Sequence, residues 1–418
     1  MKLFFVLGRE PALSLAELFA VLGEKNASVL PEIAYFEVPE TTDPGQLMNT
    51  LGGTIKIGRF LFTLPRSSSD ESLIEHITQG ILQVPGLKEL PRIRFGLSVY
   101  HGAALRSRLK SVGIKVKRAL EKLGFRSRWV VSREATLSSV VVQTNRLLTE
   151  GAEIELMDDQ KQILLGRTVA VQPFEAFEER DFVRPARDAT AGMLPPKLAR
   201  MMVNLAGAPK TAALLDPFCG MGTILMEATL LGYQKLLGGD LNLQAVQKTS
   251  QNIRWLINRF QLSPERLSSI SIFAADVRHL PKKIKLHSIQ AIVTEPFLGP
   301  PQKGHESLAQ LQAIHQTLSP LYQDMLRVFQ LLLTPNGCGV IAFPRFRFKK
   351  TFISNPILAE IKKFGFKLRS PFPENFRPPK FLSSELGTDQ KTLIYGRPDQ
   401  RVWREIAVIE KIKGGDVF

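Results

Sequence analysis

Short apolar segments alternate with helical patterns between residues 214 and 343, and this alternation constrains the fold more than any other feature of the sequence. The strand candidates are residues 214–215, 235–239, 271–274, 291–294 and 339–343. Strands and helices that alternate in this way form a mostly parallel sheet covered by helices on both faces. We therefore predict a doubly wound α/β fold for the C-terminal part of the chain.

A glycine-containing loop, LDPFCGMGT at residues 215–223, follows the first of these strands and precedes a helical pattern at 224–231. In a doubly wound sheet this loop must let a ligand approach the backbone and the helix N-terminus, and Gly220 and Gly222 permit that approach. A dinucleotide fingerprint requires a third glycine where the chain has Leu225, and the Lys and Ser/Thr pair of a phosphate-binding P-loop is missing. The loop therefore belongs to a nucleotide-binding type that matches neither motif.

One carboxylate follows each of the first three strands. Asp216 would repel a phosphate but attract an ammonium group, which indicates the amino-acid end of S-adenosylmethionine. Asp240 ends the second strand, where an acidic side chain accepts both ribose hydroxyls, although it could instead cap the helix that begins at Leu243. Asp276 follows the third strand, where a carboxylate can accept from the adenine amino group. The series predicts S-adenosylmethionine as the cofactor.

The fourth strand ends in the sequence TEPFLGPP at residues 294–301. Because Pro296 biases the residue before it toward an extended conformation, we expect Glu295 to project from the carboxyl edge of the sheet and face the cofactor. An exocyclic base amine is a poor nucleophile, and acceptors on its hydrogens stabilise the positive charge that develops during attack. Glu295 and a backbone carbonyl would be those acceptors, with Phe297 stacked on the base. The alternative is a proline-rich turn with Glu295 in solvent.

The chain carries 55 Lys and Arg against 39 Asp and Glu, and its net charge of +16 favours a polyanionic partner. Residues 92–146 contain thirteen Lys and Arg but two acidic residues, a local charge of +11, with aromatic residues interleaved. The pattern predicts strands at 93–100, 129–131 and 138–142 and a helix at 109–123. We expect a small module with one cationic face that binds RNA; the alternative is an ordinary solvated helix. The expected RNA contacts are Arg94, Arg106, Lys110, Lys115, Arg118, Lys122 and Arg128.

The N-terminal segment also alternates between strands and a helix. Residues 3–7, 35–38 and 54–64 are predicted strands, and Ser14 with Glu17 would form a capping box at the start of a helix. A Ser-rich stretch after residue 66 and a proline-rich segment at 168–197 suggest boundaries. The predicted division is 1–66, 67–167, a linker at 168–197, and 198–418.

Cysteine and histidine usage excludes several classes of protein. Cys219 and Cys338 are the only cysteines and the six histidines are scattered, so we expect neither a disulfide framework nor a metal site. Cys219 lies inside the glycine loop without a neighbouring His and is expected to pack as a small apolar residue. No window approaches the roughly 18 apolar residues of a membrane span, and the N-terminal apolar run is too short for a signal peptide. We therefore expect a cytoplasmic protein without a membrane partner.

At these motifs the chain resembles the THUMP-domain tRNA guanine-N2 methyltransferases, in particular the branch that methylates guanosine 10 of tRNA. Its N-terminal segments FVLGREP (5–11), GTIKIG (53–58) and RFGLSVY (94–100) are similar to the ferredoxin-like and THUMP regions of that family. The later segments LGRTVAVQ (165–172), DFVRPARD (181–188) and GMLPPKL (192–198) extend the similarity. The resemblance implies a ferredoxin-like domain, a THUMP RNA-binding domain and a Rossmann-like methyltransferase domain. It implies cofactor binding by Asp216, Phe218, Gly220, Gly222, Thr223, Asp240 and Asp276, with Arg187 and Asp188 nearby.

The chain departs from the family at the catalytic tetrad, which is Asp or Asn, Pro, Pro, then Tyr or Phe. Alignment on the first proline puts Glu295 at the acidic position, whereas alignment on the aromatic puts Thr294 there and retains Phe297. We prefer the first alignment, with Glu295, Pro296 and Phe297 as the catalytic residues, although the extra methylene of Glu moves its carboxylate on a scale to which catalysis is sensitive.

The sequence therefore predicts an S-adenosylmethionine-dependent methyltransferase acting on the N2 amine of a guanosine in tRNA, with position 10 as the expected target. Two alternatives stay open: an amino-methyltransferase acting on DNA or another RNA, and a non-catalytic RNA-binding protein that retains the cofactor site. The resemblance leaves open whether a small activating protein subunit is also a partner.

Overall fold

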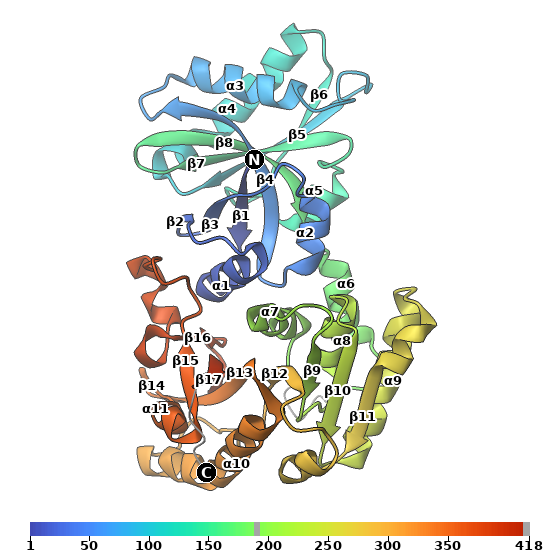
Figure 1. Cartoon of the computed structure of the whole chain (residues 1–418). Helices are drawn as coiled ribbons and strands as arrows, with labels where there is room; N and C mark the ends of the chain where they lie inside the picture. Colours follow the sequence, from blue (N-terminus) through green and yellow to red (C-terminus); the bar gives the residue numbers. More distant parts are fainter. Residues whose placement is uncertain (188–192, 413–418) are drawn as a thin grey trace. The chain divides into compact units, whose positions relative to one another are not determined.

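The computed structural model describes residues 1–187 and 193–412, which divide into two compact units (Figure 1). The first unit comprises Met1–Pro11, Asn26–Thr50 and Thr54–Glu175. The second unit comprises Ala12–Lys25, Leu51–Gly53 and Ala176–Phe418. None of the helices in the described ranges is both long enough and apolar enough to cross a membrane.

The first unit is built on one eight-stranded sheet with the order β2-β3-β1-β4-β8-β7-β5-β6. Its strands are β1 (Lys2–Leu7), β2 (Ser28–Leu30), β3 (Ile33–Glu37), β4 (Thr54–Pro65), β5 (Ile93–Tyr100), β6 (Ser127–Val130), β7 (Gly151–Asp158) and β8 (Gln162–Val171). Strand β5 pairs in parallel with β6 and β7, and the other pairs are antiparallel. Because β4 pairs with β8, the segments 1–66 and 67–167 share this sheet. Their separation into two domains stays a prediction.

Helices α3 (Asp70–Leu82) and α4 (Ala103–Lys122) pack on this sheet, and the first unit also contains α2 (Pro44–Thr50) and α5 (Ser139–Thr144). The apolar positions of α4 recur every three or four residues, which places Val112, Val116 and Leu120 in one buried stripe against the sheet. The helix predicted at 109–123 is thereby confirmed. The strand predicted at 138–142 is wrong: Ser138 Oγ accepts from Val141 N and caps α5, which overrides the strand propensity of three valines.

The second unit contains a sheet in which β11 (Ile270–Ala274), β10 (Lys235–Asp240), β9 (Ala213–Asp216), β12 (Ile289–Thr294) and β13 (Leu333–Phe348) lie side by side in that order. These five strands are parallel, and each contains one of the five predicted strands, so the doubly wound fold is confirmed. The sheet continues through β17 (Val402–Lys411) to β15 (Phe366–Arg369), with β14 (Thr351–Ile353) on β13 and β16 (Thr392–Tyr395) on β17. The sheet has the doubly wound, Rossmann-like arrangement.

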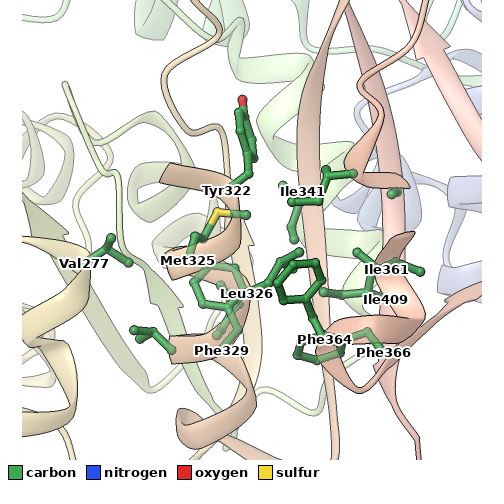
Figure 2. Packing of buried hydrophobic residues seen from close by; sticks show 14 of the residues in the cluster. Val277, Tyr322, Met325, Leu326, Phe329, Ile341, Ile361, Phe364, Phe366 and Ile409 are labelled. Atoms are coloured by element: carbon green, nitrogen blue, oxygen red, sulfur yellow. The ribbon is translucent and has the colours of Figure 1, made fainter. Parts of the chain in front are cut away.

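Helices cover this sheet and enclose its core. They are α7 (Pro196–Ala206), α8 (Thr223–Leu230), α9 (Leu243–Arg259), α10 (Leu308–Leu332) and α11 (Ile357–Glu360). Figure 2 shows Met325, Leu326 and Phe329 of α10 in one cluster with Ile341 of β13 and Ile409 of β17. The 25-residue helix α10 thus packs on β13, which pairs with β12, the strand that Glu295 of the candidate site follows.

Most of helix α1 (Pro11–Leu22) belongs to the second unit. The predicted capping box of Ser14 and Glu17 at the start of this helix is wrong. The helix begins at Pro11, a residue suited to the first helical position, and Ser14 and Glu17 lie buried inside it. Glu17 accepts from Gly52 N and Gly53 N at 2.8 Å and from Asn204 Nδ2 at 2.7 Å. Burial raises the pKa of Glu17 to about 7 despite these hydrogen bonds.

Candidate active site at the carboxyl edge of the second sheet

The carboxyl ends of the parallel strands bring the predicted carboxylates to one edge of the sheet. The strand order places them in the sequence Asp276, Asp240, Asp216 and Glu295 along that edge. The order reverses between β9 and β12, and the crevice at such a reversal is where doubly wound sheets bind ligands. Asp216 and Glu295 flank this reversal.

The glycine loop is held by Asp240 from the neighbouring strand. Asp240 Oδ2 accepts from Gly220 N at 2.9 Å and Oδ1 accepts from Asn242 N at 2.8 Å. Asn242, not Asp240, caps α9, so the capping alternative for Asp240 is wrong. Gly222 has a φ of +81° and lies so close to Thr249 that a Cβ would clash, which explains glycine at that position.

A pocket lies beside this loop. The described residues that line it are Met193, Leu194, Asp216, Phe218, Cys219, Gly220, Met221, Thr223, Ile224 and Glu295. The structure thus brings five predicted site residues together: Asp216, Phe218, Gly220, Thr223 and Glu295. The predicted residues Gly222, Asp240, Asp276, Arg187, Pro296 and Phe297 do not line it, and Asp188 lies outside the described residues.

Asp216 is almost completely buried at the pocket wall. Its Oδ1 accepts from Thr294 Oγ1 at 2.7 Å and from Phe218 N at 3.2 Å. Burial raises the pKa of the Asp216 carboxyl to about 7, against the lowering effect of those two hydrogen bonds. Thr294 is therefore occupied in holding Asp216, which favours Glu295 over Thr294 as the acidic residue of the tetrad.

Glu295 forms a bidentate ion pair with Arg404 of β17, in which Nε contacts Oε2 and Nη2 lies 3.1 Å from Oε1. The side chains of Glu295 and Arg404 are only 15% and 7% exposed. Burial opposes the charge on Arg404, but the neighbouring carboxylate outweighs it and raises the pKa of the guanidinium above its ordinary value. Glu295 thus lines the pocket in a fixed orientation, and the alternative in which it lies in solvent is wrong.

The residues after Glu295 form an open loop. The Phe297 side chain is 59% exposed, while its carbonyl accepts from the buried Tyr322 hydroxyl at 3.0 Å. The backbone of Phe297 is thus anchored to α10, and its ring remains accessible. The position suits an aromatic that stacks on a base, although that role stays a prediction.

Two residues of the predicted cofactor set have other partners. Asp276 accepts from Arg278 Nε at 3.0 Å and Nη2 at 2.7 Å, and these contacts are the first cause of a pKa lowered to about 2. Arg187 is exposed, and its guanidinium lies over the Phe182 ring. Cys219 is buried, which raises the pKa of its thiol above the usual range and agrees with a packing role.

Three residues that support the pocket were not predicted from the sequence. Arg404 is 109 positions from its partner Glu295, so no local pattern reveals it. Arg184 Nη1 donates to Thr223 Oγ1 at 2.7 Å, although it lies in the segment predicted as a linker. Asn252 accepts from Ala186 N and donates to the carbonyls of Ala186 and Met221, which ties that segment to the glycine loop.

Five of the seven predicted RNA contacts line two grooves of the first unit, whereas Arg94 and Arg128 line neither of them. Lys115, Arg118 and Lys122 share one groove with Glu71 and Glu75 of α3. Arg106 and Lys110 line the other groove with Trp129. Acids outside the window 92–146 neutralise part of its charge through the pairs Arg94–Glu150 (3.0 Å), Arg106–Glu32 (3.6 Å), Arg108–Asp70 (2.9 Å) and Lys115–Asp70 (3.5 Å). The local charge of +11 therefore overstates the free positive charge of this unit.

Residues 184–368 match the family model described as RMKL-like, methyltransferase domain. The chain is 34% identical over 143 residues to the tRNA (guanine(10)-N2)-dimethyltransferase of Methanothermobacter thermautotrophicus, which covers 33% of this chain and 37% of that protein. It is 32% identical over 151 residues to the tRNA (guanine(6)-N2)-methyltransferase of Thermus thermophilus, covering 36% and 39%. The matched segments thus span less than two fifths of these relatives.

Among solved structures, the chain resembles TrmN from Thermus thermophilus, with a TM-score of 0.53 and 21% identity. The superposition covers 98% of this chain and 99% of TrmN. At this level of identity the likeness concerns the fold, and it extends through both units.

Proposed function

We propose that the chain, whose residues 184–368 match the RMKL-like methyltransferase domain model, transfers the methyl group of S-adenosylmethionine to the N2 amine of a guanosine in tRNA. The observation that carries the proposal is the pocket that both Asp216 and Glu295 line, at the point where the strand order reverses. One carboxylate suits the cofactor and the other suits the amine that receives the methyl group.

The residues present fit the cofactor. Asp216 is a buried carboxylate beside the glycine loop, where the cofactor's ammonium group would compensate the cost of its burial. Asp240 lies at the end of the next strand, and each of its oxygens retains a lone pair after its backbone contact, so it would accept from the ribose hydroxyls. When bound, S-adenosylmethionine supplies a methyl group activated by a sulfonium. Asp276 lies farther along the edge and would contact adenine only after Arg278, which is exposed, turns away.

Glu295 would act on the nucleophile. A carboxylate has roughly four lone-pair positions, of which the bidentate contact with Arg404 uses two. The others can accept from the guanosine amine and stabilise the positive charge that grows on nitrogen as the new bond forms. Arg404 fixes the orientation of the longer Glu side chain, which answers the positioning problem raised by the departure from the tetrad.

Guanosine in tRNA is the proposed substrate because the relatives of the matched segment are named for that chemistry, at position 10 in one case and position 6 in the other. Position 10 is the first candidate. The first unit, with Arg118, Lys122 and Arg128 among its cations, would hold the folded RNA by shape and phosphate contacts. The target base would have to leave its stack to reach the pocket.

Label transfer from methyl-labelled S-adenosylmethionine tests this proposal against its rivals. The purified chain is incubated with unmodified tRNA, with duplex DNA and with an unrelated structured RNA of the same length. We expect label in tRNA only. Label in DNA or equally in the unrelated RNA would favour another amino-methyltransferase, and no label in any acceptor, with cofactor binding retained, would favour the non-catalytic RNA-binding protein.

A further inference from the structure

Strand β13 runs past the carboxyl end of its neighbour β12. Thr294, the last residue of β12, pairs with Ile341, whereas β13 continues to Phe348 and turns back through β14. At roughly 3.3 Å per residue, the extension reaches about 20 Å beyond that edge. Pro344, near its base, lies opposite Arg404, the partner of Glu295. The hairpin of residues 344–353 therefore projects from the same edge of the sheet as the candidate site.

Three of the four cationic side chains of this hairpin have no carboxylate partner among the described residues. Arg345, Arg347, Lys349 and Lys350 lie within six residues, and no Asp or Glu occurs from residue 325 to residue 359. Arg345 lies 3.7 Å from Glu405, but within the described residues Arg347, Lys349 and Lys350 form no ion pair with any carboxylate. The cations of the first unit differ, since several of them are paired.

Aromatic packing makes the hairpin a stiff arm. Cross-strand register puts Arg345 opposite Trp403 and Arg347 opposite Phe352, so these four side chains lie on one face. The centres of the Phe352 and Trp403 rings are 4.5 Å apart, and the Arg345 guanidinium lies 5.3 Å from the centre of the Phe352 ring. The Arg347 side chain donates to the Pro398 carbonyl. The lysines at the tip are exposed, while these contacts hold the two strands that carry them.

We propose that the tip of this hairpin binds the phosphate backbone of the RNA strand that carries the target nucleotide. The choice of RNA rests on the proposed function, whereas the charge and the placement of the arm are independent of it. A polyanion is the partner that fits uncompensated lysines beside a crevice that must receive a nucleotide. The catalytic unit would then hold its substrate strand directly, in addition to contacts made by the first unit.

The test compares two double variants with the same change in charge. Lys349→Glu with Lys350→Glu alters the tip, and Lys282→Glu with Lys285→Glu alters two exposed lysines that precede β12, at the opposite edge of the sheet. Affinity for fluorescent tRNA is measured by anisotropy across a salt series. We expect the tip variant to bind tRNA about tenfold more weakly than the control. The slope of log affinity against log salt concentration should also become shallower, by about one phosphate contact for each lysine.

A third variant, Lys349→Arg with Lys350→Arg, keeps the charge and is expected to bind as the unaltered chain does. Affinity for S-adenosylmethionine, measured by calorimetry, should be equal in all four proteins. A tip variant that binds tRNA within twofold of the control would overturn the inference. Because binding is measured without turnover, a chain that binds RNA through the tip but methylates no tRNA would refute the proposed function alone.

Discussion

Thr294 Oγ1 donates a 2.7 Å hydrogen bond to Asp216 Oδ1, and this bond joins the ends of two neighbouring strands where the order of the sheet reverses. Thr294 is fully buried, so the contact is shielded from water. The residue directly after Thr294 is Glu295, whose carboxylate is turned toward Arg404. One short segment of β12 thus positions both carboxylates of the proposed site.

Cofactor affinity is expected to depend on pH through Asp216. An ammonium group attracts the ionised carboxylate, and the pKa of Asp216 in the free protein is about 7. We therefore predict constant affinity for S-adenosylmethionine well above pH 7 and a loss of up to about tenfold for each pH unit below it. Thr294→Val removes a hydrogen bond that lowers this pKa, so the midpoint should move to higher pH. Calorimetry from pH 5.5 to 8.5 measures the affinity of the wild type and of Thr294→Val for the cofactor. The control is Asp216→Asn, whose amide does not titrate and which should bind weakly at every pH. A wild-type affinity that is as independent of pH as that of the control would contradict the role of Asp216.

Glu295 and Arg404 are expected to govern turnover more than cofactor binding. Glu295→Gln should lower kcat by roughly 10²–10³-fold while the Kd for S-adenosylmethionine stays within twofold, because its acceptor role matters most as the amine becomes cationic. Arg404→Gln should also lower kcat, since the carboxylate loses its bidentate contact. The double variant should be little worse than Glu295→Gln, because both changes act on one interaction. Additive effects in single-turnover measurements would show that Arg404 acts elsewhere.

Glu17 is expected to stabilise the second unit although it lies in the N-terminal segment. Glu17→Ala removes the acceptor of Gly52 N, Gly53 N and Asn204, so we predict a loss of about 1–3 kcal/mol in the free energy of unfolding. The exposed Glu265→Ala is the matched control. Because the pKa of Glu17 rises from 4.5 to about 7 on folding, its ionised form is disfavoured in the fold. The free energy of unfolding of the wild type, relative to that of Glu17→Gln, should therefore fall as pH rises from about 4.5 to about 7. A difference between the two proteins that does not change with pH would contradict this account.

The groove between α3 and α4 is expected to contribute to tRNA binding through α4. Reversal of Lys115, Arg118 and Lys122, which share one helical face, should weaken binding and flatten its salt dependence. Glu71 and Glu75 oppose these cations, so the loss should be smaller than three fully free charges would give. Reversal of Lys282, Lys283 and Lys285 in the second unit supplies the comparison. Equal losses in the two triple variants, measured by filter binding, would mean that α4 is not a specific RNA platform.

The sequence predicted the second sheet well because its signals are local. Four of the five parallel strands are short apolar runs that end at or just before an Asp or Glu, and a parallel sheet necessarily gathers such ends at one edge. Arg404 could not be predicted, because its contact with Glu295 depends on β17 pairing antiparallel with β13. The contact of Thr294 with Asp216 likewise exists only after β9 and β12 become neighbours.

The wrong predictions also arise from contacts between residues that are distant in the sequence. Ser14 and Glu17 have the spacing of a capping box, yet Pro11 starts the helix and both side chains bond to glycines some 35 residues away. The charge counted over residues 92–146 ignored Glu32, Asp70 and Glu150, which lie outside that window but pair with its cations. A charge total along the chain therefore does not give the charge of a surface. The β13–β14 hairpin has a smaller total, but a larger fraction of its cations has no carboxylate partner.

Replacement of single guanosines by inosine tests the central claim most directly, because inosine lacks only the exocyclic amine. Unmodified tRNA is compared with tRNA that carries inosine at position 10 and tRNA that carries inosine at position 6, and the labelled nucleosides are identified by mass spectrometry. We predict N2-methylguanosine in the unmodified tRNA and its loss from one inosine variant, with position 10 as the first candidate. Methylation of any other nucleoside, or N2-methylguanosine formed at equal rates in all three RNAs, would contradict the account.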